Sequence, residues 1–503
     1  MSLLGSSAGI WMLLALGILT VGTGLPVWAL LIAVASAFAT AGLAFGVIDL
    51  NILSALPARL VGLLEHDLLQ ALPLYVFVGV LLQRLPIADA LFASLARILR
   101  PLGAAPSLAA LGVGALVAPM NGSVASSSAL LTRLVGPRLA HLAPSRAISL
   151  SAVAATIGVV VPPSLVLLLL GDAMLMAHLE ASRLPGYLPV GQRIINTQDV
   201  MHAALLPALC VLALWALVAW WQGRSTGALN AKMASAQATP SVPQQFLALA
   251  STAVILGLLA GVFTGKLFAV EAAATGGCLL VLGALASRSL SWPQWRGVMA
   301  DTLALSGALI ALLTGATVFS LVLRLFGTDR LLAETLLSPG VPAHLAALLV
   351  LLLVALCAWV LDAFEMIFVV IPIVAPPLVA MLGDAQQAAV LLLLVLQLSF
   401  LIPPMGYAIL MARARASDSH VPVNQIIVSL LPFILAQLAL ACVVFLMPQS
   451  VHLLDGPAPT AQESAPASQE DIEKQMQEMS APVDAASAPG ADPAASLKPE
   501  PAK

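Results

Sequence analysis

Apolar residues occur along this chain in long runs separated by short polar loops. Runs of about 20 mainly apolar residues, the length that a membrane-spanning helix needs, recur from Ala8 to the neighbourhood of Leu446. The predicted spans lie near residues 8–22, 27–48, 67–83, 145–172, 198–221, 245–263, 267–287, 300–325, 386–411 and 425–447. Two further apolar segments, 106–134 and 341–382, are interrupted in the middle. The pattern predicts an all-α polytopic membrane protein, whose first run is a retained span rather than a signal peptide.

Composition and the spread of reactive residues narrow the class of protein. Hydrophobic residues make up 60% of the 503 positions and charged residues only 9%, against about 25% charged residues in soluble domains. The chain contains no HExxH zinc motif and no Walker A phosphate-binding loop, and its histidines and cysteines are scattered. We therefore expect no enzymatic activity, no use of ATP, no nucleic-acid binding and no cofactor. An ion gradient is the energy source that remains for a transporter.

Basic residues in the loops predict the orientation of the chain. If the two interrupted segments are re-entrant hairpins, twelve basic residues fall on one side of the membrane and six on the other. The richer side is cytoplasmic by the positive-inside rule. It holds Arg84, Arg97, Arg100, Arg133, Arg138, Arg146, Arg224, Lys232, Arg288, Arg296, Arg413 and Arg415. This topology places both termini in the periplasm.

Two Pro-Pro pairs inside apolar runs reveal an internal repeat. The segment Gly-Val-Val-Val-Pro-Pro-Ser at 158–164 matches Ser-Phe-Leu-Ile-Pro-Pro-Met at 399–405, at an offset of 241 residues. In each half an apolar segment is interrupted 41 residues before the first proline of the pair, at Asn121 and at Asp362. Repeated broken helices mark the binding sites of many transporters. With five full spans in each half, the second repeat is expected to be inverted relative to the first.

The breaks are candidate binding sites because prolines within a span free backbone carbonyl groups at membrane depth. Such groups persist only where they are buried in protein or line a polar cavity, and unwound helix ends suit a hard cation such as Na⁺. The amino-terminal ends of the adjoining half-helices suit an anionic substrate group. The candidate Na⁺ and substrate residues are Asn121, Gly122, Ser123, Ser126, Gly158, Pro162, Pro163, Ser164, Asp362, Glu365, Ser399, Pro403 and Pro404.

Asp362 and Glu365 are the only carboxylates deep within an apolar stretch, and they allow two interpretations. An intramembrane carboxylate is a functional candidate by default and would serve H⁺-coupled transport. Alternatively, Asp362 caps a hairpin half-helix and Glu365 satisfies free amide groups, as in a capping box. The small residues at 121–128 also allow two interpretations, a binding site or a contact face between helices, because small residues in spans often form such faces.

The motifs within 114–172, 361–372 and 399–406 resemble the large membrane subunit of tripartite ATP-independent periplasmic (TRAP) transporters. The resemblance covers about 60–450 and is most specific in the two Pro-Pro blocks. It implies an elevator-type secondary transporter in the bacterial inner membrane that imports a small carboxylate, of the keto acid or lactate type, together with Na⁺. It also implies two partners, a small four-span membrane subunit and a periplasmic solute-binding protein.

The same resemblance places Na⁺ between the tip at 121–126 and the break at 158–162, and again between the Asp362 tip and the break at 399–403. The alternative within transport is a stand-alone Na⁺-coupled dicarboxylate symporter of related fold, which needs no binding protein. The first predicted inverted repeat covers 1–222, with a hairpin at about 106–134 and a broken helix at 145–172, and a cytoplasmic linker follows at 223–244. The second predicted inverted repeat covers 245–450, with a hairpin at about 341–382 and a broken helix at 386–411. Residues 454–503 are predicted to form a disordered periplasmic tail.

Overall fold

Regular secondary structure is helical throughout the part of the chain that the computed structural model describes, and no strand occurs there. The described residues are 3–49, 54–65, 67–121, 124–135, 137–139, 142–162, 164–184, 195–224, 241–336, 340, 342–359, 361–402, 406–415 and 421–454. Among them, seven helices are long and apolar enough to cross a membrane, or nine if each of two bent helix pairs forms one span. The predicted all-α polytopic membrane fold is confirmed, while the predicted tail and most of the predicted linker lie outside the described residues.

The first half of the chain consists of full-length helices, one short amphipathic helix and several half-length helices. In order they are α1 (Leu3–Thr23), α2 (Val27–Ala44), α4 (Leu56–Leu64), α5 (Asp67–Arg84), α6 (Ile87–Ile98), α7 (Ala105–Asn121), α8 (Val124–Val135), α9 (Pro144–Val160), α10 (Leu165–Ala181) and α11 (Thr197–Arg224). Short 3₁₀ turns, η1 (Arg100–Leu102) and η2 (Pro137–Leu139), flank the pair α7 and α8. With 17 and 12 residues, α7 and α8 are shorter than a bilayer-crossing helix.

The second half contains helices in a similar order. They are α13 (Val242–Phe263), α14 (Ala269–Ala286), α15 (Trp292–Leu325), α16 (Thr328–Leu336), α17 (Ala343–Cys357), α18 (Ala363–Glu365), a π-helical turn η3 (Met366–Val370), α19 (Ile371–Leu382), α20 (Ala385–Ser399), α21 (Tyr407–Arg415), α22 (Val423–Leu446) and the 3₁₀ turn η4 (Pro448–Val451). The second leg of the hairpin, from α18 to α19, is long enough to cross a membrane, whereas α17 is a shorter apolar helix.

One difference between the halves concerns the third span. In the first half this span is a bent pair, α4 and the described part of α5, whose axes meet at 49°. In the second half it is the single 34-residue helix α15. This helix begins eight residues before the predicted span at 300–325, because Ser291 and Gln294 form a capping box and Pro293 occupies the first turn.

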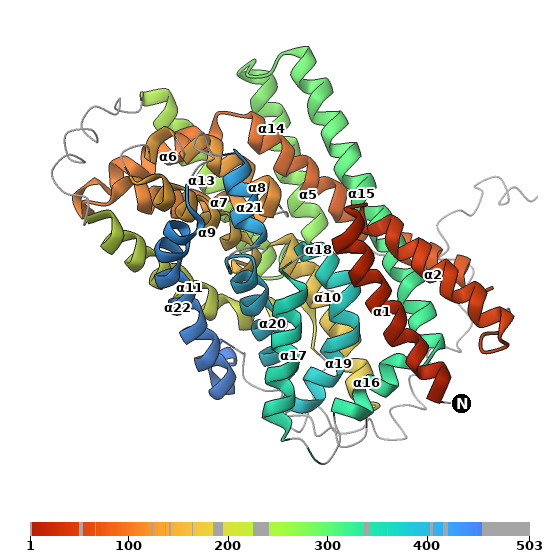
Figure 1. Cartoon of the computed structure of the whole chain (residues 1–503). Helices are drawn as coiled ribbons and strands as arrows, with labels where there is room; N and C mark the ends of the chain where they lie inside the picture. The colour runs from red at the N-terminus through yellow and green to blue at the C-terminus, as the bar shows by residue number, and fades with distance from the viewer. Residues whose placement is uncertain are drawn as a thin grey trace, which may run out of the picture. The chain divides into compact units, whose positions relative to one another are not determined.

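Helices of the two halves pack in matching pairs. Thus α2 packs against α15 as α14 packs against α5, and α10 packs against α19 as α21 packs against α8. The amphipathic helices follow the same rule, with α6 against α13 and α16 against α1. Figure 1 shows the hairpin α7–α8 beside α9 in the upper part and α17, α19 and α16 together in the lower part. These pairings are the ones expected if the two halves are related by a pseudo-two-fold axis, and the inverted repeat stays a prediction.

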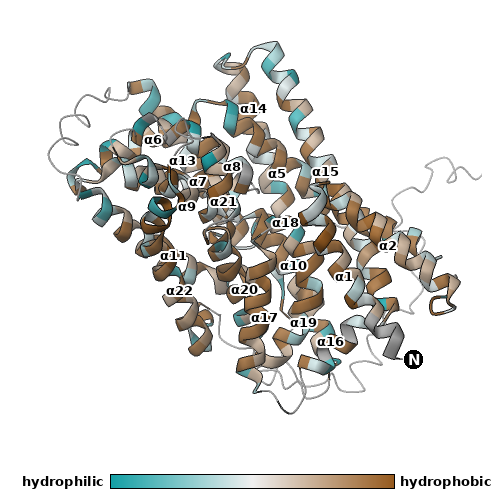
Figure 2. Ribbon diagram, in the orientation of Figure 1, coloured by the Kyte–Doolittle hydropathy of each residue, from teal (hydrophilic) through white to brown (hydrophobic). Residues whose placement is uncertain are grey.

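Large apolar side chains cover the outer surface of the described helices. On α17, Leu348, Leu352 and Leu356 are all exposed at helical spacing, and α13 exposes Phe246 and Leu249 in the same way. Figure 2 shows hydrophobic colour along the lengths of α1, α2, α17 and α22. Exposed apolar bands of this extent fit a hydrocarbon environment.

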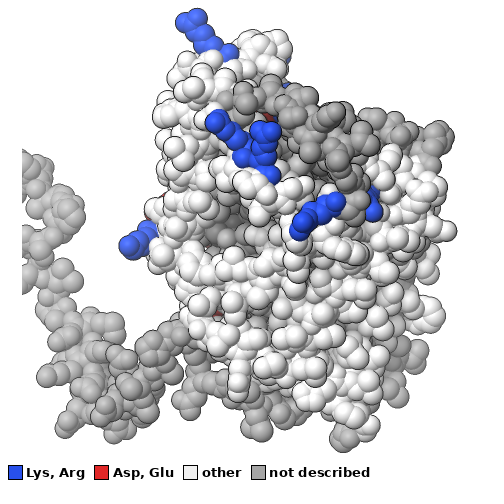
Figure 3. Space-filling view, turned by 90° about the vertical axis from the view of Figure 1, so that its left-hand side faces the viewer, with Lys and Arg blue, Asp and Glu red and all other residues white. Residues whose placement is uncertain are grey.

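Basic side chains are unevenly distributed over the described residues. On the face drawn in Figure 3, the visible Lys and Arg side chains lie in the upper half, and the lower half is almost free of colour. Figure 3 is turned by 90° about the vertical axis from Figure 1, so heights correspond, and the upper part of Figure 1 contains α6, α8 and α14. An asymmetry of this kind agrees with the positive-inside rule that the sequence suggested.

Candidate functional site

The break in the first half interrupts a helix within the protein interior. Helix α9 ends at Val160 and α10 begins at Leu165, with an angle of 42° between their axes. Val161 is extended between them, and the buried Ser164 caps α10. The Ser164 hydroxyl accepts a hydrogen bond from Leu167 N at 3.1 Å and donates one to Val159 O at 3.5 Å. Ser164 therefore joins the two half-helices, and its place in the candidate site is that of a structural cap.

Helix α7 runs parallel to α9 and ends beside this break. A β-carbon on Gly114 would lie 2.5 Å from Ala154 O, and one on Gly158 would lie 2.4 Å from the carbonyl carbon of Ala118. Both helices thus approach through small residues four positions apart, in the same order along each chain segment. Consequently the carboxyl ends of α7, at Asn121, and of α9 lie side by side. The unpaired carbonyl groups at two such ends carry partial negative charge, which favours a cation between them.

The tip of the first hairpin is only partly described. Asn121 is the last residue of α7, whereas Gly122, Ser123 and Pro163 lie outside the described residues. Ser126 lies in the first turn of α8. Gly158 packs directly against the backbone of α7, because the absence of a side chain lets the two helices meet there, and its part in the cation site stays a prediction.

The tip of the second hairpin is organised by its two carboxylates. Asp362 Oδ1 accepts a hydrogen bond from Ala363 N at 2.8 Å, and Glu365 Oε2 accepts one from Asp362 N at 3.1 Å. This is the capping box of α18, so the capping interpretation of Asp362 and Glu365 is confirmed. A π-helical turn, a rare conformation that is frequent at functional sites, follows at Met366–Val370.

A tryptophan ties this second tip to the second break. Trp359 Nε1 donates a hydrogen bond to Ile402 O at 2.7 Å, directly before the prolines at 403 and 404, which lie outside the described residues. Gly406 N donates to the same carbonyl oxygen at 3.0 Å. The hydroxyl of the buried Ser399 donates to Val395 O at 2.7 Å, within its own helix. Trp359 was not among the predicted site residues, because a tryptophan near the end of a span is commonly a membrane-interface anchor.

The two halves meet at equivalent positions near the breaks. Gln397 Nε2 of α20 donates a hydrogen bond to Thr156 O of α9 at 3.2 Å, and these residues are 241 positions apart, which is the offset of the repeat. Gln437 Nε2 of α22 donates to Gln397 Oε1 at 2.7 Å. All three residues are buried. Since each member of the first pair precedes its own break by six residues, the two breaks flank a common centre.

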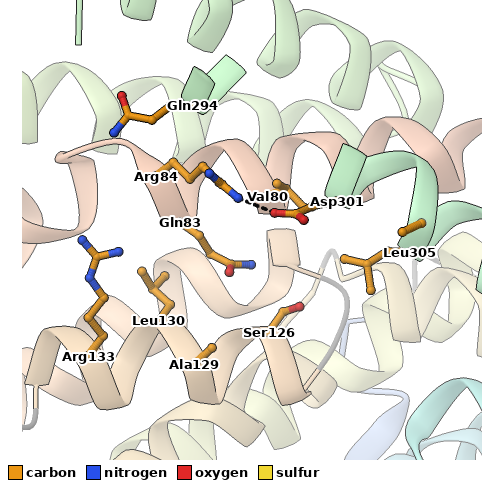
Figure 4. A pocket seen from close by; sticks show the side chains of 11 residues that line it. Val80, Gln83, Arg84, Ser126, Ala129, Leu130, Arg133, Gln294, Asp301 and Leu305 are labelled. Atoms are coloured by element: carbon orange, nitrogen blue, oxygen red, sulfur yellow. Dashed lines mark hydrogen bonds and ion pairs between the residues drawn. The ribbon is translucent and has the colours of Figure 1, made fainter. Parts of the chain in front are cut away.

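A polar cavity of about 570 Å³ lies between α5, α8 and α15. Figure 4 shows Arg84 and Asp301 paired across it, with Arg133 and Ser126 projecting from α8. The remaining lining residues are Val80, Gln83, Ala129, Leu130, Gln294, Ala304 and Leu305. Of the predicted site residues that the structure describes, Ser126 alone lines this cavity, whose wall is assembled from three helices that are far apart in the sequence.

These features are typical of a polytopic permease: two broken helices, hairpin tips beside them, and a polar cavity at one hairpin leg. The family model of the tripartite ATP-independent periplasmic transporter, DctM component, matches residues 10–450. The chain belongs to this family, that of the TRAP transporter large permease subunits.

Three curated relatives agree with this assignment. The sialic acid TRAP transporter large permease protein SiaM of Vibrio cholerae is 24% identical over 407 residues, covering 79% of this chain and 88% of that protein. The C4-dicarboxylate TRAP transporter large permease protein DctM of Rhodobacter capsulatus is 20% identical, covering 58% of this chain and 64% of that protein. The isethionate TRAP transporter permease protein DctMQ of Oleidesulfovibrio alaskensis is 22% identical, covering 69% of this chain and 52% of that protein.

The fold also matches a solved structure. The crystal structure of the Alcanivorax borkumensis YdaH transporter, described as having an unusual topology, superposes with a TM-score of 0.59. The match covers 90% of this chain and 100% of that chain at 17% sequence identity. At this identity the likeness concerns the fold alone.

Proposed function

We propose that this permease imports a small organic acid across the bacterial inner membrane together with Na⁺. The curated relatives are named for sialic acid, a C4-dicarboxylate and isethionate, which are all organic anions. Within that range we assign a small carboxylate of the keto acid or lactate type. The substrate reaches the permease from a periplasmic binding protein, and a small four-span membrane subunit accompanies it.

The observation that carries the proposal is the convergence of two helix carboxyl ends at the first break. The contacts of Gly114 and Gly158 bring the backbones of α7 and α9 together, the second within a turn of the ends of both helices, and this supports a cation site formed by their terminal carbonyl groups. Na⁺ is a hard cation that such neutral oxygens suit. The second candidate site, at Ile402 and the Asp362 tip, is held together by the Trp359 hydrogen bond. A moving body of hairpins and broken helices would carry both sites in an elevator mechanism.

H⁺ coupling through Asp362 and Glu365 is the second candidate. Each carboxylate has one oxygen committed to a backbone amide of the capping box, which favours a structural role. Neutral Asp362→Asn and Glu365→Gln side chains retain an acceptor oxygen for those amides. Uptake that survives in both variants and still requires a Na⁺ gradient would support the Na⁺ proposal. Uptake that both variants abolish, and that follows the proton gradient, would support H⁺ coupling.

Reconstitution tests the proposed partners and the driving ion together. Proteoliposomes that contain both membrane subunits receive the binding protein and a radiolabelled 2-oxo acid on the outside. We expect uptake only with the binding protein present and a Na⁺ gradient directed inward. Uptake by this chain alone would instead identify a stand-alone symporter, and uptake indifferent to Na⁺ would refute the coupling ion.

A further inference from the structure

Three charged side chains, two positive and one negative, line the cavity between α5, α8 and α15. Arg84 of α5 and Asp301 of α15 form an ion pair, so their charges compensate. Arg133, in the last turn of α8, lines the same space and makes no hydrogen bond or ion pair with any residue in the described ranges. The cavity therefore has one formal positive charge for which the described residues supply no counter-ion.

Polar groups with unused hydrogen-bonding capacity lie near that charge. Ser126 and Gln83 both line the cavity, and neither forms a side-chain hydrogen bond within the described part of the chain. Gln294 uses its carbonyl oxygen to accept from the backbone amide and the hydroxyl of Ser291, so its NH₂ group is available. The cavity thus offers a hydroxyl and two carboxamides besides the guanidinium.

The shape and charge of the cavity point to one class of ligand. We infer that it is a subsite for a monocarboxylate that carries a second polar group, with the carboxylate on Arg133 and the second group near Gln83; this inference rests on the proposed function. A guanidinium binds a carboxylate through two parallel hydrogen bonds. A volume of about 570 Å³ lies within the usual range for small-molecule sites.

Charge balance separates a monocarboxylate from a dicarboxylate. One negative charge neutralises the single uncompensated guanidinium, whereas a second carboxylate in the cavity would lack a counter-charge unless it displaced Asp301 from Arg84. A second carboxylate would also be repelled by Asp301 with no further cation to offset it. Val80, Leu130 and Leu305 supply apolar walls that suit a short hydrocarbon chain.

The location couples this subsite to the first candidate cation site. Ser126 and Arg133 lie on one helix, α8, about 10 Å apart along its axis at a rise of 1.5 Å per residue. The amino-terminal end of α8 adjoins the tip at Asn121, where α7 ends. A carboxylate held by Arg133 therefore lies on the same hairpin leg whose tip borders the cation site, so substrate and ion would move as one unit.

Calorimetric titration of the purified permease in nanodiscs of neutral phosphatidylcholine tests the inference. The probes are 2-oxobutyrate, its uncharged amide and the dicarboxylate succinate. We expect the wild type to bind 2-oxobutyrate in preference to both others. Arg133→Gln should weaken that binding about tenfold or more, which is the effect of losing charge-assisted hydrogen bonds. Arg133→Lys, which keeps the charge but not the planar fork, should show a smaller loss.

Two further variants complete the test. Asp301→Asn frees Arg84 and should shift the preference towards succinate, because the cavity then carries two uncompensated positive charges. Arg97→Gln, on the outer surface of α6 and away from the cavity lining, serves as the matched control and should bind 2-oxobutyrate like the wild type.

The outcomes distinguish this inference from the proposed function. If the reconstituted system imports a 2-oxo acid but Arg133→Gln and Arg133→Lys bind 2-oxobutyrate like the wild type, the subsite is wrong and the function stands. Wild-type preference for succinate would also overturn the subsite. If the system imports no carboxylate and the wild type binds none of the probes, both proposals fail.

Discussion

At the scale of single residues, the first break depends on glycine positions as much as on polar side chains. Gly158 lies where the backbone of α9 approaches that of α7, as Gly114 does one turn earlier on α7, and a β-carbon on Gly158 would lie well inside contact distance of Ala118. The hydroxyl groups of Ser164 and Ser399, the polar residues at the breaks, form hydrogen bonds with nearby backbone atoms. The Ser164 hydroxyl is thus engaged in capping, and the ligands that we propose for the first break are backbone carbonyl groups.

Substitution of Gly158 by Ala should force α7 and α9 apart. We expect a loss of about 1–3 kcal/mol in unfolding free energy, the usual cost of overpacking, together with weaker Na⁺ binding. The matched control is Gly257→Ala on α13, where nothing lies within 4 Å of an added β-carbon. Thermal unfolding of both variants, with and without Na⁺, measures the two effects. Equal behaviour of the two variants would contradict the close helix contact.

At the scale of helices and hairpins, some features could be predicted from the sequence. The Pro-Pro pairs and the equal spacing of 41 residues predicted that each hairpin tip lies near its break, and the Trp359 bond to Ile402 O now provides a direct contact in the second half. In the structure, Pro144 occupies the first turn of α9 and Ser164 caps α10, although the sequence suggested Ser164 as a binding residue. These features depend on residues that are close together in the chain, so they can be recognised in the sequence.

Contacts between distant segments could not be predicted in this way. The bond from Gln397 to Thr156 O spans 241 residues, and a buried glutamine in an apolar run gives no indication of its partner. The same holds for the cavity around Arg133, whose wall comes from α5, α8 and α15. Such sites arise from tertiary packing, which a hydrophobic pattern does not specify.

The tie between hairpin tip and break yields an element-scale prediction. Trp359→Phe keeps an aromatic ring but removes the donor to Ile402 O, a loss of about 1 kcal/mol. We expect lower thermal stability and a higher Na⁺ concentration for half-maximal uptake. Trp292→Phe, an exposed tryptophan at the start of α15, is the control. A Trp359→Phe variant with unchanged Na⁺ dependence would show that the bond does not support the second cation site.

At the scale of the whole molecule, α15 carries an ion pair towards each end. Asp301 pairs with Arg84 of α5, and Arg324, in the last turn, pairs with Glu180 of α10. The first pair joins two helices that pack directly on each other, while the second connects α15 to a helix that belongs to the first broken span. The Arg324–Glu180 pair, between residues 144 positions apart, is thus a link between the long helices and the body that contains the breaks.

Breaking this link should loosen α10 relative to α15. Glu180→Gln is expected to broaden the distance distribution between spin labels on the two helices, and the charge-swapped double variant Glu180→Arg with Arg324→Glu should narrow it again. The effect on unfolding free energy should stay within about 1 kcal/mol, since both side chains are partly solvated. An unchanged distribution in Glu180→Gln would mean that the pair does not restrain the two bodies.

The central claim is that the converging carboxyl ends of α7 and α9 bind Na⁺, and one measurement tests it most directly. A ligand that binds the folded state but not the unfolded chain stabilises the folded state by RT ln(1 + [L]/Kd), and so raises the unfolding temperature as its concentration rises above Kd. The purified permease should unfold at a higher temperature in NaCl than in KCl of equal concentration, and the difference should shrink in Gly158→Ala but not in Gly257→Ala. Identical unfolding temperatures for the wild type in NaCl and KCl would contradict the account.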